Sequence, residues 1–159
     1  MQNKSRLLYI LNLLYHESDE DHSITITQIL ERLQQAKIES NRRTVAHDLK
    51  VLADNGFDVV CNKSRQNQYF IGDRQFELPE LKLLVDAVQA SKFISTKKSK
   101  VLIDKLSKLV SVHQSDELNR QLYVDKQVKS DNEAIYYTVD LLHTAINSNK
   151  QVEFKYYEY

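Results

Sequence analysis

Glycine and proline are scarce in this chain, with two glycines and one proline among 159 residues. Sandwiches and barrels are rich in tight turns, and tight turns rely on these two residues for their backbone angles. A chain so poor in both is therefore expected to be mainly helical. Its apolar content of 42% is enough for a hydrophobic core, and its length suits one ordinary domain or two small ones.

Apolar periodicity predicts two helices at the start of the chain. Hydrophobic residues recur at helical spacing from Lys4 to Tyr15, and the acidic stretch HESDEDHS that follows is expected to be a solvated loop. Thr25 and Gln28 have the spacing of a capping box, in which each side chain bonds the backbone N–H of the other residue. A second helix is therefore predicted from this point to about Ala36.

A third helix is predicted from Asn41 to about Asn55. Ser40 or Asn41 can serve as its N-cap, and Gly56 follows it at the position where a left-handed residue often ends a helix. Its buried face is expected to consist of Val45, Leu49 and Leu52.

The first turn of this helix carries two adjacent cations, Arg42 and Arg43. The partial positive charge of a helix N-terminus disfavours each cation there by about 0.3–1 kcal/mol. A phosphate bound at that terminus would turn the penalty into an attraction, because free backbone N–H groups also point outward there. The same side of the helix continues with Thr44, His47 and Lys50, a polar stripe suited to a nucleic-acid groove.

The periodicity changes after Gly56. DVVCNK and QYFIG are β-prone runs separated by the polar turn SRQN, which predicts a two-stranded hairpin with Lys63 and Arg65 near its tip. An isolated hairpin is marginal in water, so it is expected to pack on the three helices. Three short helices followed by a hairpin are the layout of a winged helix-turn-helix, which we assign to residues 1–75.

Residues 76–130 are predicted to be a helical connecting segment. Leu78-Pro79-Glu80 is a favourable helix start, and the inward face of that helix is expected to be Leu81, Leu84, Val85 and Val88. A second helix, capped by Ser95, would turn Leu102, Leu106 and Leu109 inward. A short third helix would open at Ser115-Asp116-Glu117, and the polar run from Val124 to Glu133 is expected to be a linker.

Residues 131–159 are predicted to begin an α+β domain. A helix is expected from about Ala134 to Asn147, and KQVEFKYYEY then alternates like a strand, with Val152, Phe154 and Tyr156 on one face. A lone strand leaves its backbone edges unpaired. Either it pairs with the hairpin or another subunit, or the chain stops inside a domain that should continue; we favour the second alternative.

Charge and cysteine content limit the possible functions. The formal net charge is zero, and the first 75 residues hold equal numbers of acids and bases, so any DNA contact must depend on how the charges are distributed. The single cysteine cannot form an internal disulfide, and no apolar run approaches the roughly 18 residues of a membrane span. We expect a soluble, cytoplasmic protein without a membrane partner.

The sequence offers no catalytic constellation. Its five histidines are scattered without a metal-ligand spacing, two glycines cannot build a phosphate-binding loop, and no Ser/His/Asp set stands out. We therefore expect no enzyme activity, no cofactor and no metal site.

The segment NRRTVAHDLKVLADNGFDVV resembles the recognition helix and first wing strand of bacterial WYL-domain transcriptional regulators, often grouped as DeoR-like. The matching residues are Arg42, Arg43, Thr44, Asp48, Leu49, Leu52 and Gly56, with Tyr69 near the end of the wing. FELPELKLLVDAV is similar to the connecting region of that family. AIYYTVDLLHTAINSNKQVEFKYYEY is similar to the opening helix and strand of the WYL domain.

The resemblance implies a transcription factor that is controlled by a ligand such as a nucleotide or nucleic acid. This chain departs from the family in three places. The connection QQAKIES is longer than the usual tight turn, and His47 stands where an aromatic residue or arginine is common. The motif that names the WYL domain is not present, so the ligand-sensing residues have no counterparts here and the effector is unknown.

Together these features predict a sequence-specific regulator that binds double-stranded DNA as a homodimer. Arg43, Thr44 and His47 would face the groove, Arg42 and Lys50 would lie nearer phosphate, and Lys63 and Arg65 would contact DNA from the wing. The alternative is a winged helix that binds another protein, which predicts an exposed apolar patch on the third helix. A small enzyme ranks third and would need a cleft with clustered ionisable groups.

Overall fold

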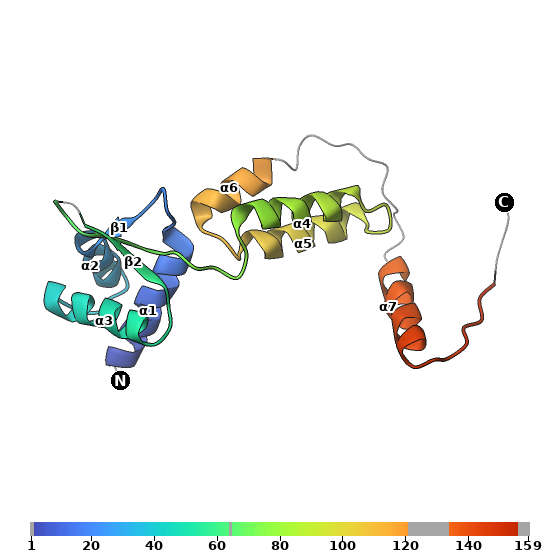
Figure 1. Cartoon of the computed structure of the whole chain (residues 1–159), viewed down its shortest axis with the longest axis horizontal. Helices are drawn as coiled ribbons and strands as arrows, with labels where there is room; N and C mark the ends of the chain where they lie inside the picture. Colours follow the sequence, from blue (N-terminus) through green and yellow to red (C-terminus); the bar gives the residue numbers. More distant parts are fainter. Residues whose placement is uncertain (1, 64, 121–133, 156–159) are drawn as a thin grey trace.

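The chain is mainly helical, with one small antiparallel sheet near its N-terminus (Figure 1). This computed structural model describes residues 2–63, 65–120 and 134–155. The described elements are α1 (Gln2–Glu17), β1 (Ile24–Thr25), α2 (Ile26–Gln35), α3 (Arg42–Asp54), β2 (Val59–Asn62), β3 (Gln68–Ile71), α4 (Leu78–Ala90), α5 (Thr96–Ser107), α6 (Val112–Arg120) and α7 (Ala134–Asn147). The prediction of a mainly α chain with a β-hairpin is confirmed. No described helix combines the length and the apolar character needed to cross a membrane.

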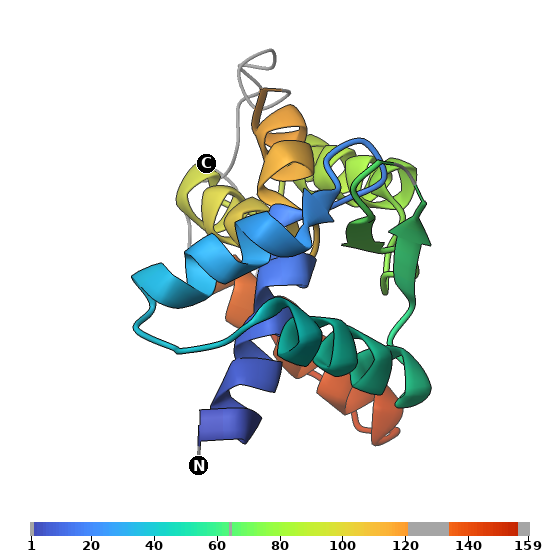
Figure 2. The ribbon, with the colours of Figure 1, turned by 90° about the vertical axis from the view of Figure 1, so that its left-hand side faces the viewer.

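The first hydrophobic core lies between α1, α2, α3 and the sheet (Figure 2). Each helix turns one apolar stripe inward, and the fully buried members include Ile10, Leu14, Ile29, Leu33, Val45 and Ile71. The predicted buried face of α3 is confirmed, because Val45, Leu49 and Leu52 are all buried. Gly56 follows α3 with a φ of +91°, the left-handed conformation expected of a residue that ends a helix.

The sheet contains one strand that the sequence pattern did not predict. Its order is β1-β3-β2, and the predicted hairpin is β2 and β3. β1 pairs Ile24 with Tyr69 and Thr25 with Gln68, while the Thr25 side chain also completes the predicted capping box with Gln28. A two-residue strand is too short to show a period of two. β1 therefore ties the hairpin to the start of α2.

A second core holds α4, α5 and α6 together. Its buried members are Leu81, Val85, Ile103, Val110 and Leu118. α4 and α5 run side by side, and α6 packs against both (Figure 1). The expected inward positions Leu81 and Val85 are confirmed for α4, but Leu84 is 38% exposed and Val88 is half-buried.

Two details of the predicted connecting helices differ in the structure. The buried apolar residue of α5 is Ile103, and of the three leucines predicted to face inward Leu106 and Leu109 pack against this core, while Leu102 is half-buried. α6 begins at Val112 and not at Ser115, because Ser111 Oγ accepts a hydrogen bond from the Gln114 backbone N–H at 3.1 Å and acts as the cap.

The predicted last helix exists as α7, but the expected strand after it is not formed in the described part of the chain. Residues 151–155 have no regular structure, and Tyr156 and the predicted linker from Val124 to Glu133 lie outside the described residues. No described strand lies beside this segment to complete its backbone hydrogen bonds (Figure 1). The apolar side of α7 is uncovered by other described residues, with Ile146 68% exposed.

A polar joint connects the two cores at the C-terminal end of α1. The Arg74 guanidinium donates hydrogen bonds to the backbone carbonyls of Tyr15, at 2.9 Å, and Ser18, at 2.6 Å. The Ser111 hydroxyl donates to the Asp19 carboxylate, and the His22 and His113 rings stack with their centroids 3.9 Å apart. We call these seven residues the polar joint.

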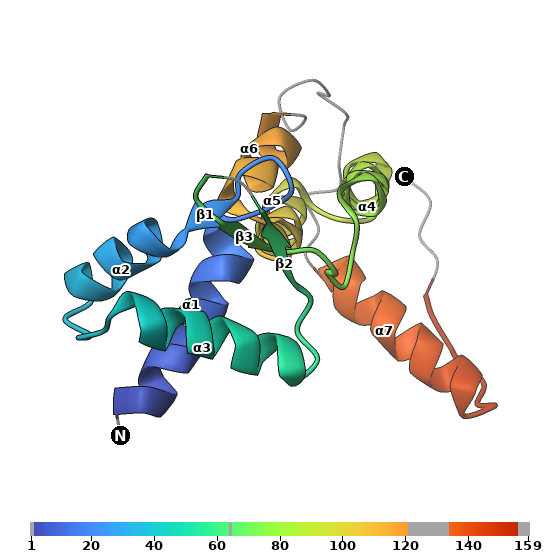
Figure 3. The same ribbon diagram turned by 60° about the vertical axis from the view of Figure 1, so that its left-hand side comes forward.

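The polar joint corrects the expectation that HESDEDHS is a solvated loop. Ser18 and Asp19 are buried, while Glu20 and Asp21 are exposed. Burial raises the pKa of Asp19, but hydrogen bonds from Ser111 and His22 outweigh burial and leave that pKa below its ordinary value. The acidic segment therefore lies against α6, at the end of α1 away from α3 (Figure 3).

Candidate nucleic-acid interface

The start of α3 is fixed by Asn41, one of the two N-cap candidates. Its Oδ1 atom accepts a hydrogen bond from the Thr44 backbone N–H and another from the Thr44 hydroxyl, both at 3.0 Å. The helix then begins at Arg42. Arg42 and Arg43 consequently both lie in the first turn, as the sequence predicted, and that turn contains no acidic residue.

α3 has a buried side and a cationic outer side. Over residues 42–50 the exposed side chains are Arg42, Arg43, Ala46, His47 and Lys50, and Ala53 and Asp54 are exposed at the C-terminal end of the helix. Thr44 is half-buried and its hydroxyl hydrogen is used in the cap, so it presents mainly an acceptor oxygen. The small Ala46 among longer polar side chains lets a ligand approach the helix backbone closely.

The hairpin places two further cations at the same end of the molecule as the start of α3. Lys63 and Arg65 are exposed on either side of the turn between β2 and β3. Figure 1 shows the start of α3, the end of β2 and the start of β3 at the side of the molecule opposite α4 and α5. Asp19, the acidic residue of the polar joint, lies at the other end of α1, against Ser111.

The arginines of the described residues differ sharply in their partners. Arg6 pairs with Asp48, Arg32 pairs with Glu17, and Arg74 bonds two backbone carbonyls. No hydrogen bond or ion pair joins Arg42, Arg43 or Arg65 to any other described residue. The same holds, across the described ranges, for the side chains of His47, Lys50 and Lys63.

Sequence reasoning missed one residue that shapes this surface. Asp48 belongs to the segment that carries the family resemblance, but its burial was not foreseen, because aspartate is rarely found inside a protein. It is 6% exposed and its carboxylate bonds the buried Arg6 of α1. An available signal was its position three residues after Val45 and one before Leu49, within the apolar stripe of α3.

Exposed large hydrophobic side chains are absent from α2, α3 and the hairpin, as far as these elements are described. They occur instead on α1, at Leu8, and on α4, α5 and later segments. The outer face of α3 therefore has none of the apolar character that a protein-binding helix presents.

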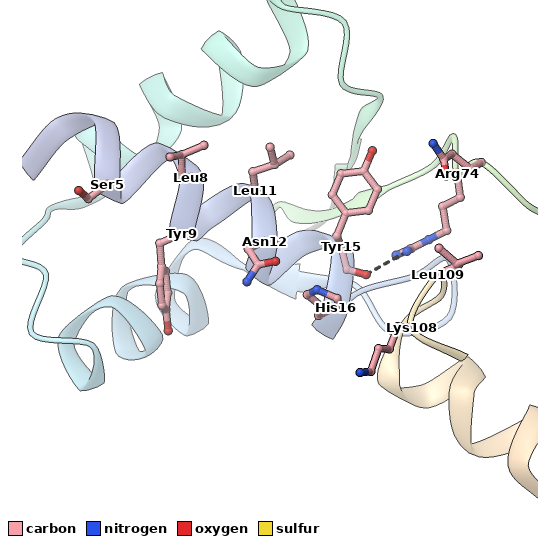
Figure 4. A pocket seen from close by; sticks show the side chains of 11 residues that line it. Ser5, Leu8, Tyr9, Leu11, Asn12, Tyr15, His16, Arg74, Lys108 and Leu109 are labelled. Atoms are coloured by element: carbon pink, nitrogen blue, oxygen red, sulfur yellow. Dashed lines mark hydrogen bonds between the residues drawn. The ribbon is translucent and has the colours of Figure 1, made fainter. Parts of the chain in front are cut away.

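The described residues contain no metal centre. No group of three or more His, Cys, Asp or Glu side chains is arranged to hold a metal ion within these ranges. A groove of about 730 Å³ runs along α1 beside the polar joint, and Figure 4 shows Tyr15, His16, Arg74 and Lys108 along it. No carboxylate lines this groove.

Comparisons with known proteins give no relative for this chain. No protein-family model, no curated protein and no solved structure matches it.

Proposed function

We propose that residues 1–75 form a winged helix-turn-helix that binds double-stranded DNA in a sequence-specific manner. The order helix, strand, helix, helix, strand, strand, with a three-stranded sheet ordered β1-β3-β2, supports this assignment. In such domains α3 enters the major groove and the β2–β3 hairpin acts as the wing.

The observation that carries the proposal is the unpartnered cationic start of α3. Arg42 and Arg43 occupy the positive end of a helix dipole without a counter-charge from the rest of the described chain. Arg6, Arg32 and Arg74 all have internal partners, so the chain is able to satisfy guanidinium groups and does not do so at this helix start. A DNA phosphate at this helix end supplies the missing negative charge.

We assign different roles to the residues of the stripe formed by Arg43, His47 and Lys50. Residues four and then three positions apart share one helix face, so all three reach the same groove. Arg43, nearest the helix N-terminus, is placed to read a base edge, most favourably the two acceptors of guanine. Arg42 and Lys50 lie nearer the phosphate backbone, and Lys63 and Arg65 add non-specific contacts from the wing.

The protein-binding alternative has less support. A helix that docks into a protein partner uses apolar anchors at helical spacing. The outer face of α3 offers cations and Ala46 in their place, and no large hydrophobic side chain is exposed on it. Control of binding by an effector stays a prediction of the family resemblance.

The decisive experiment selects binding sequences from a random duplex library with the full chain and then measures affinities at two salt concentrations. Arg43→Ala should lower the affinity for the selected site by the equivalent of about 1–3 kcal/mol and relax the preference at one base pair. Lys63→Ala should weaken all sequences alike and reduce the salt slope by about one.

Lys100→Ala is the matched control, because it removes one exposed cation from α5, away from the proposed interface. It should leave the affinity for the selected site nearly unchanged. Failure of the library to yield any enriched sequence, or an Arg43→Ala variant with wild-type affinity, would refute the proposal.

A further inference from the structure

A buried ion pair joins α1 to the inner side of α3. Arg6 Nε donates to Asp48 Oδ2 at 2.6 Å, and Arg6 Nη2 donates to Asp48 Oδ1 at 3.3 Å. Arg6 is 7% exposed and Asp48 is 6% exposed. Figure 3 shows α3 crossing α1, and the two helices are in contact. Arg6 and Asp48 therefore form a bidentate ion pair inside the first core.

The ion pair opposes the effect of burial on Arg6. The hydrogen bond that Arg6 donates to the Asp48 carboxylate raises the pKa of Arg6, against the opposing effect of burial. Taking two charges out of water has a large desolvation cost, and replacing a buried ion pair with apolar residues of similar size is often neutral or even stabilising. Stability alone is thus a poor explanation for keeping this pair in the core.

The fixed geometry of the hydrogen bonds in this ion pair is a better explanation for its presence in the core. The other inward residues of α3, Val45, Leu49 and Leu52, are apolar, and hydrophobic contacts set no strict angle. A guanidinium bound to both oxygens of a carboxylate has a fixed geometry. Successive residues of a helix lie about 100° apart around its axis. A rotation of α3 about its axis by a fraction of that angle would therefore turn Arg43 and His47 away from the direction in which they now point.

We propose that Arg6 and Asp48 are positioning residues, which fix the rotation of α3 about its own axis and so set which side chains meet the bases. This inference rests on the proposed DNA-binding function and deepens it. The two residues do not touch DNA themselves, since both are buried on the side of α3 that faces α1. They affect the ratio of affinities for different DNA sequences more than the affinity for DNA in general.

The test replaces the pair by apolar residues in the double variant R6M/D48L, which leaves the net charge unchanged. Thermal unfolding should give a midpoint within a few degrees of the wild type. The ratio of affinities for the selected and a scrambled duplex, measured at one salt concentration, should fall at least about tenfold. The affinity for the scrambled duplex should stay the same, because the charge that attracts DNA is the same.

The matched control is E17Q/R32Q, which removes the exposed Arg32–Glu17 pair and also preserves net charge. It should keep the wild-type ratio. The single variant Asp48→Asn supplies a second arm, since it keeps the size of the side chain and removes its charge. It should lose discrimination and also unfold at a lower temperature.

Amide hydrogen exchange on the free protein tests the same inference without DNA. In R6M/D48L, peptides covering residues 42–52 should exchange at least several-fold faster, while peptides from α5 should exchange at the wild-type rate. A folded R6M/D48L variant with wild-type discrimination, or with unchanged exchange in α3, would overturn the inference. If the wild type itself selects no sequence, the DNA-binding proposal fails, and the exchange measurement still decides whether the pair fixes α3.

Discussion

At the scale of single residues, the arginines fall into two groups, those with a partner inside the protein and those without one in the described residues. Arg6, Arg32 and Arg74 are satisfied inside the protein, whereas Arg42, Arg43 and Arg65 have no partner in the described residues. Two of the unpartnered arginines stand where a helix dipole disfavours them. An external anion is the simplest physical reason for that placement, and DNA is the polyanion that we propose for it.

Asp19 allows a prediction about pH. Its folded pKa is depressed, so its contribution to stability is present above the unfolded pKa of about 3.9 and is lost as the pH falls through the folded value. Asp19→Asn should therefore reduce the free energy of unfolding near neutral pH by about 1–3 kcal/mol, because charged hydrogen bonds to Ser111 and His22 are lost.

Urea unfolding of both proteins at several pH values checks this. The gap between wild type and Asp19→Asn should shrink steadily below about pH 4, where the wild-type carboxylate becomes protonated. A gap of constant size across the whole range would show that the charge of Asp19 contributes nothing to the polar joint.

At the scale of elements, the N-cap residues fix where each helix begins. Asn41 starts α3, Thr25 starts α2, and Ser111 starts α6. The first two were predictable, because a capping residue next to a periodic apolar stripe is a local signal. The start of α6 was not, because Ser111 is followed by a short helix whose single buried residue shows no period.

Asn41→Ala should destabilise the protein by about 1 kcal/mol, because the backbone N–H of Thr44 loses its partner at the helix start. It should also loosen the first turn, which carries Arg42 and Arg43, and lower the affinity for DNA. Chemical denaturation and binding measurements check both effects. Asn41→Ser, which keeps an acceptor at the cap, should restore most of the stability; equal loss in both variants would mean that the cap contributes little.

At the scale of the whole molecule, α1 is the element common to both parts. Near its start it holds α3 through Arg6, and at its end it meets the second core through the polar joint. The second core then offers an apolar groove of about 620 Å³ between α4 and α5, lined by residues that include Leu84, Val88 and Leu102. We propose this groove as the dimer interface, because an operator with two-fold symmetry requires a two-fold protein.

Analytical ultracentrifugation should show a dimer for the wild type and a monomer for Leu84→Glu, since a charge in an apolar interface is left unpaired. The variant should keep affinity for a half-site duplex and lose affinity for the full palindrome. Leu8→Glu is the control, because it charges an exposed leucine on α1. If that variant alone dissociates the dimer, the interface lies on α1; a wild-type monomer at every concentration would remove the dimer altogether.

Local sequence patterns were enough to predict the helical character of the chain and the two sides of α3. The scarcity of glycine and proline predicted helices, the apolar stripe of α3 predicted its buried side, and the positions of Arg42, Arg43, His47 and Lys50 predicted an exposed cationic face. Each of these depends on neighbours within a few turns of the chain, which the sequence displays directly.

Contacts between distant residues needed the tertiary structure. Arg6 and Asp48 are 42 positions apart, Asp19 and Ser111 are 92 apart, and strand β1 exists because a hairpin edge lies beside it. Nothing local distinguishes a buried aspartate from a solvated one, since burial is decided by which helix packs over it. The sequence by itself therefore determined which residues face outward on α3, and only the packing of α1 against that helix decided what holds them there.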